Sequence, residues 1–128
     1  MAMNHLPAVL MTWTAGLLLA TGWLTLTGRL PPNHLLGIRT RRTLADPAAW
    51  HVAHQAAGPW VLAAGMADLL FAAALLTGPP APVTAALCGA GVLLTVILLV
   101  VAAASGVAAL GRRTGHPDSR RDAHDRGR

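Results

Sequence analysis

Three long runs of residues with almost no charge constrain this chain more than any motif. Residues 6–27 and 83–110 contain no charged side chain, and residues 59–77 contain one. Because the hydrocarbon core of a bilayer is about 30 Å thick, roughly 20 helical residues cross it, and the runs are suitable in length. Hydrophobic residues make up 54% of the 128 residues and charged residues only 12%, which is too apolar for an ordinary water-soluble domain. The runs predict an all-α membrane protein with three transmembrane helices.

The connections between the runs support this division. Residues 78–82, Gly-Pro-Pro-Ala-Pro, cannot continue a helix because proline lacks an amide donor and restricts the residue before it, so we expect a tight turn there. Residues 28–58 form a longer connection, which we expect to be an ordered loop. A cleaved signal peptide is the alternative for the first run, but no Arg or Lys precedes it and it is long for one. We interpret it as a retained helix.

The distribution of arginine predicts the orientation of the helices. The chain has ten Arg and no Lys, with four Arg in residues 28–58, six in residues 112–128, and none in the N-terminal tail or the proline-rich turn. Three crossings place both basic segments on one side, and the positive-inside bias makes that side the cytoplasm. Residues 112–128 mix Arg, Asp and His without an apolar period, which predicts a disordered cytoplasmic tail that either sets the topology or contacts anionic lipid.

The long connection contains one predicted helix start. Asp46 followed by Pro47 offers an N-cap acceptor and a proline at the first helical position. On this helix Trp50 and His54 share a face at i and i+4. We expect irregular chain before Asp46. At Gly58-Pro59 we expect either a kink or the start of a fresh helix.

The same segment resembles the signature of the SdpI family, small bacterial membrane proteins named for an immunity protein against a secreted killing toxin. The residues that carry the resemblance, in the family's order and spacing, are Pro32-Asn33, Gly37-Ile38-Arg39-Thr40, Thr43-Leu44, Trp50, His54 and Gly58. Residues 10–110 fit the family's three-helix layout. Arg41-Arg42 stands where the family more often has an apolar or aromatic pair, and Gln55 where it commonly has a basic residue. The resemblance implies an SdpI-like domain over residues 1–111 in the bacterial inner membrane. The arginine distribution places the N-terminus outside and the C-terminus in the cytoplasm.

What the resemblance implies about function is binding. The helices would present a membrane-embedded surface to a peptide toxin, and the cytoplasmic loop would hold the helices in register or dock a regulator such as the repressor that the family's namesake recruits. The residues expected to organise the loop or bind the partner are Asn33, Gly37, Arg39, Thr40, Thr43, Trp50, His54 and Gly58. Anionic phospholipids are expected partners of the loop arginines, whose guanidinium groups suit phosphate. We expect no nucleic-acid partner, and self-association stays open.

A single acid lies in the middle of the second run. Asp68 is the tenth of 19 residues counted from Pro59, and a carboxylate at that depth costs about 2.5–3.5 kcal/mol on insertion scales. It should therefore face other helices and be protonated or hydrogen-bonded. Antiparallel packing brings Thr14 and Thr95 to the same level. Small residues that permit close approach of the helices are Gly16, Gly65, Gly89 and Gly91.

Two further function classes stay open. If Asp68 is a proton- or ligand-sensitive site rather than a hydrogen-bonded link between helices, the chain would be a small transporter or a proton-linked permease component. A structural membrane subunit, whose basic loop and tail hold a partner complex, is the other alternative.

No constellation predicts catalysis or a cofactor. The chain lacks paired carboxylates, a nucleophile–base set and a phosphate-binding glycine loop, so we expect no enzyme. His51 and His54, with His34 as a third nitrogen, would be a weak metal set, because zinc sites use better-defined ligands. Cys88 is the single cysteine, which excludes an internal disulfide. We expect no metal and no cofactor.

Overall fold

Four helices make up the described part of the chain. The structure is a computed structural model that describes residues 5–31, 38 and 41–114. Its elements are α1 (Leu6–Leu26), α2 (Arg41–Ala45), α3 (Pro47–Leu76) and α4 (Ala81–Thr114). α1, α3 and the part of α4 up to Arg112 are long and apolar enough to cross a membrane, and these described ranges contain no strand. The predicted all-α class with three transmembrane helices is confirmed.

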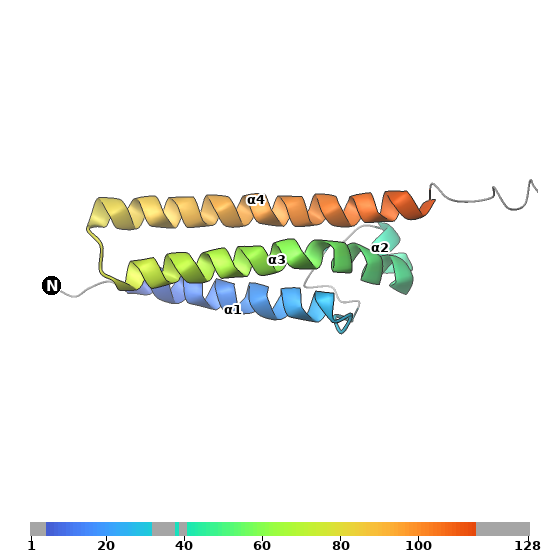
Figure 1. The fold of residues 1–128 in the computed structure, drawn as a ribbon, viewed down its shortest axis with the longest axis horizontal. Coiled ribbons are helices and arrows are strands. Elements are labelled where there is room, and N and C mark those ends of the chain that lie inside the picture. Colours follow the sequence, from blue (N-terminus) through green and yellow to red (C-terminus); the bar gives the residue numbers. More distant parts are fainter. Residues whose placement is uncertain (1–4, 32–37, 39–40, 115–128) are drawn as a thin grey trace, which may run out of the picture.

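The three long helices run side by side with α3 between α1 and α4 (Figure 1). The chain reverses direction at each connection, so α3 is antiparallel to both neighbours. The short helix α2 packs against the N-terminal part of α3, at the end of the bundle where α1 and α4 finish. One end of the molecule therefore carries the loop and the other carries the proline-rich turn.

The two helix ends that precede the connections both use glycine in the left-handed region. Gly28 has φ +66° after α1, and the amides of Arg29 and Leu30 donate to the Leu24 carbonyl at 2.9 and 3.1 Å. Gly78 has φ +71° after α3. A residue with a Cβ is strained in this conformation, so glycine ends each helix at little cost. The tight turn after α3 lies where the prolines predicted it, although α4 already begins at Ala81.

Helix α3 is one continuous helix of 30 residues. The sequence left open whether a kink or a fresh helix occurs at Gly58-Pro59, and Pro59 lies inside the helix. Its missing amide leaves the Gln55 carbonyl without its usual donor in the next turn. At the N-terminus the Asp46 side chain caps the helix as predicted, with its Oδ1 accepting from the Ala48 amide at 2.9 Å.

Two predicted boundaries were wrong. Residues 41–45 form α2 where we expected irregular chain; the stretch contains no helix breaker, and it ends where Asp46 takes the extended backbone that a following proline requires. α4 continues through Thr114, so the predicted start of the tail at residue 112 falls within a helix. Residues 115–128, the rest of the predicted tail, lie outside the described residues.

Close helix contacts occur at some of the expected glycines. A Cβ placed at Gly65 would lie 2.9 Å from Cγ of Leu19, and one at Gly91 would lie 2.7 Å from Cε of Met11. The prediction is wrong for the other two expected positions, which face open space: Gly16 and Gly89. Glycines at tight contacts that the sequence did not indicate are Gly22, Gly58 and Gly106.

The outward faces of the long helices are apolar. Leu17 on α1, Leu70 on α3 and Val100 on α4 are each more than half exposed. Lipid tails accept such side chains, whereas water would not, and the helices satisfy their own backbone groups internally. The chain is a multi-pass membrane protein.

Candidate functional site

The first turns of α3 carry two stacked rings at the loop end of the bundle. Trp50 is 0% exposed and His54 is 3% exposed. Their ring centroids are 4.0 Å apart and the ring planes are 24° from parallel. The i and i+4 spacing predicted that they share a face, and the stacking confirms it.

These rings hold the connection at two separate points. The Trp50 indole Nε1 donates to the Leu30 carbonyl at 3.1 Å, just after α1 ends. His54 Nε2 accepts from the Ile38 amide at 2.9 Å, just before α2 begins. Thr43 of α2 is buried, and its hydroxyl donates to the Ile38 carbonyl at 2.8 Å. We call this group of five residues the loop clasp, because α3 fastens the chain on both sides of the segment that leads from α1 to α2.

The hydrogen bonds assign the protonation of His54. Its Nδ1 lies 2.8 Å from the Trp50 carbonyl, which can only accept, so Nδ1 carries a hydrogen. Nε2 accepts from the Ile38 amide, so it carries none, and the ring is neutral.

Tight backbone contacts support the loop clasp from both sides. A Cβ at Gly58 would lie 2.8 Å from Cδ2 of Leu26 and 2.9 Å from Oγ1 of Thr25, so α1 and α3 approach closely there. A Cβ at Gly106 of α4 would meet the Ile38 side chain and lie 2.8 Å from the Ala53 carbonyl oxygen. Glycine at each position lets a neighbouring element reach the clasp.

The other predicted loop residues cannot be placed. Asn33, Gly37, Arg39 and Thr40 lie outside the described residues, and so does His34, so their roles stay predictions. Among residues 5–31, 38 and 41–114, no group of three His, Cys, Asp or Glu side chains could hold a metal ion.

Asp68 forms a second polar site in the C-terminal half of α3, at the middle of the apolar run of residues 59–77. It is 4% exposed, and its Oδ2 accepts from the Thr14 hydroxyl of α1 at 2.9 Å. Its Oδ1 accepts from the Thr95 hydroxyl of α4. The Thr14 oxygen is also 3.0 Å from the Met11 carbonyl, within its own helix. The depth match predicted this trio, and the structure brings all three residues together.

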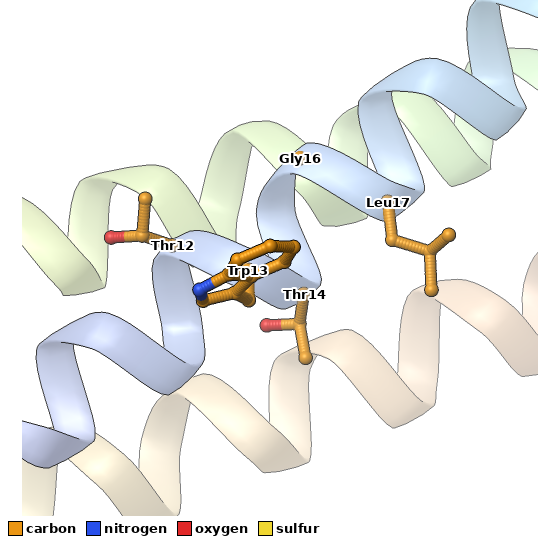
Figure 2. Close-up of a pocket in the computed structure, with 5 residues that line it drawn as sticks. All are labelled: Thr12, Trp13, Thr14, Gly16 and Leu17. Atoms are coloured by element: carbon orange, nitrogen blue, oxygen red, sulfur yellow. The ribbon is translucent and has the colours of Figure 1, made fainter.

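A groove with apolar walls runs beside the Asp68 trio. It has a volume of about 330 Å³ and is lined mainly by leucine and valine side chains of α1 and α4, among them Leu17 and Val96, with Asp68 as its acidic group. A second hollow of about 460 Å³ lies along α1 and shares Thr14 and Leu17 with the groove. Figure 2 shows the side chains of Thr14 and Leu17 extending from α1 toward α4. The sequence predicted Asp68 and its partners, whereas the groove could be identified only from the way the helices pack.

The fold and the loop clasp define a class of protein: a three-span membrane protein in which the chain between α1 and α2 is bonded to α3 at Leu30 and Ile38, at one end of the bundle. A family model for the SdpI/YfhL protein family matches residues 29–109, which is well over half of the chain. The chain belongs to this family, as the resemblance of the loop implied. The match begins just after α1 and takes in the connection, α2, α3 and most of α4. Neither curated proteins nor solved structures gave a match to the chain.

Proposed function

We propose that this protein is a bacterial inner-membrane protein that acts by binding a peptide toxin or a cytoplasmic regulator, and that it catalyses no reaction. The observation that carries the proposal is the loop clasp. Trp50 and His54 are buried and hold the signature connection at Leu30 and Ile38, so the chain is anchored on both sides of residues 32–37. Anchoring favours recognition of a partner, since a preorganised surface loses less entropy on binding.

The charge at the loop end supports the proposed orientation. Arg29, Arg41 and Arg112 are all exposed and belong to the end of the bundle that carries the loop. Each arginine near an anionic leaflet contributes about 1 kcal/mol of attraction. We place this end in the cytoplasm by the positive-inside rule, with the N-terminus outside and phospholipid head groups as partners of the arginines.

Protection of a sensitive bacterium tests this function. Cells that express the chain should survive a peptide toxin that kills cells without it, and His54→Ala should remove the protection because the Ile38 amide loses its acceptor. His51→Ala is the matched control, since His51 is a neighbouring, half-buried histidine on the same helix. Membrane levels of all variants are compared by immunoblot. Absence of protection against every candidate toxin, or full protection by His54→Ala at an equal membrane level, contradicts the proposal.

A second candidate function follows from Asp68. An ionisable group held by two hydroxyls in the middle of an apolar run is typical of proton or substrate paths, so a small transporter or a proton-linked permease component is the alternative. It predicts proton or substrate flux in vesicles containing the purified protein, and loss of flux in Asp68→Asn. Equal flux in the two proteins argues against it. Crosslinked co-purification from native membranes separates both functions from that of a structural subunit.

A further inference from the structure

We propose that the groove between α1 and α4 binds a lipophilic cation, with Asp68 as its counter-ion. The ligand class is an apolar body that carries one quaternary or protonated cationic centre. The inference concerns a site away from the loop clasp and does not depend on toxin protection. It names a substrate class for the Asp68 site, but binding does not require transport.

The first step is the acidic side chain of Asp68 and the partners that it has. Its two oxygens accept one hydroxyl each, from Thr14 and Thr95, whereas a carboxylate has about four acceptor positions. In the described part of the chain Asp68 has no ion pair. The arginines whose exposure the structure describes, Arg29, Arg41 and Arg112, lie at the loop end, several helical turns away. A carboxylate in a membrane is stable when a cation faces it. The structure therefore leaves a place for a positive charge.

The second step is the chemistry of the walls. The side chains that line the groove, such as Leu17 and Val96, are apolar apart from Asp68 and its two threonine partners. A strongly hydrated cation would lose its water there without replacement, and a neutral apolar molecule would leave the carboxylate uncompensated. A lipophilic cation matches both features, because its charge faces the Asp68 carboxylate and its apolar body contacts the walls of the groove. The two threonine hydroxyls hold the carboxylate in place, so its position is set before the ligand arrives.

The third step is size and access. The groove volume of about 330 Å³ falls at the small end of the 300–1,000 Å³ that small-molecule sites span. α3 packs extensively against both neighbours, while α1 and α4 meet each other little, so the groove between them is partly open along its side. A ligand dissolved in the bilayer reaches Asp68 directly from the lipid.

Equilibrium binding to the purified full-length protein in a neutral detergent tests the proposal. The probe is tetraphenylphosphonium, and tetraphenylborate serves as an anion of the same shape. We expect saturable binding of the phosphonium only, and Asp68→Asn should raise its Kd at least about tenfold, as loss of a buried charged contact does. Asp46→Asn, at the N-cap of α3 and away from the groove, should leave Kd unchanged. Equal affinity in Asp68→Asn, or equal binding of the borate, overturns the proposal.

A second pair of variants decides the matter if Asp68→Asn does not fold. Val96→Trp fills the groove and keeps the carboxylate, so it should also raise the Kd of the phosphonium at least about tenfold. Leu93→Trp is the control, because Leu93 is exposed on the same helix and does not line the groove. Binding by Val96→Trp as tight as that of Leu93→Trp refutes the site. Toxin protection by the wild type is scored separately, so either proposal can fail alone.

Discussion

Trp50→Phe is the most direct test of the loop clasp, because it removes one hydrogen bond and keeps a stacked aromatic ring. The indole donates to the Leu30 carbonyl at 3.1 Å, and Leu30 is only 4% exposed. Phenylalanine leaves this buried carbonyl without that donor, which costs about 1–3 kcal/mol. The free energy required to open the connection locally should fall by the same amount. The fraction of molecules in which the connection is open should therefore rise about 5- to 150-fold.

Limited digestion with trypsin measures this opening, because the connection contains four arginines. When reclosing is faster than cleavage, the cleavage rate follows the open population. We expect Trp50→Phe to be cut in residues 29–42 about 5- to 150-fold faster than the wild type. Trp60→Phe is the matched control, since Trp60 lies on the same helix and is 41% exposed. If the two variants are cut in the connection at the same rate, the indole hydrogen bond does not hold the loop and the reasoning fails.

Two further predictions concern stability in detergent, measured by unfolding with increasing dodecyl sulfate. Gly106→Ala should destabilise by about 1–3 kcal/mol because its Cβ would crowd the Ala53 carbonyl, whereas Gly89→Ala, in open space, should not destabilise. Asp46→Ala should cost about 1 kcal/mol through the lost N-cap, and an unchanged midpoint would show that the cap contributes nothing.

The sequence predicted the parts of the fold that depend on composition and helix period. Length and apolar character determine the three crossings, and the depth of Asp68 along its run was enough to identify Thr14 and Thr95 as its partners. The i and i+4 spacing of Trp50 and His54 likewise placed both rings on one face. Each of these inferences uses distances along helices, which sequence separation fixes directly.

Other features depend on how helices rotate and pack, which sequence spacing does not determine. Gly65 and Gly16 look alike in sequence, yet only Gly65 faces a neighbouring helix. Two of the acceptors in the loop clasp are the Leu30 carbonyl and the His54 ring, and no residue type predicts that a particular carbonyl will accept a hydrogen bond from an indole. The groove beside Asp68 exists because α1 and α4 both pack on α3 and leave space between themselves.

Pro59 gives α3 a point of compliance between its two polar sites. The 14 residues from His54 to Asp68 correspond to about 21 Å of helix, and the broken bond at the Gln55 carbonyl lies within that length. A helix bends most easily where one of its backbone hydrogen bonds is absent. A tilt at this position would swing the imidazole and the indole, with the connection they grip, while the carboxylate stayed seated between its two hydroxyls.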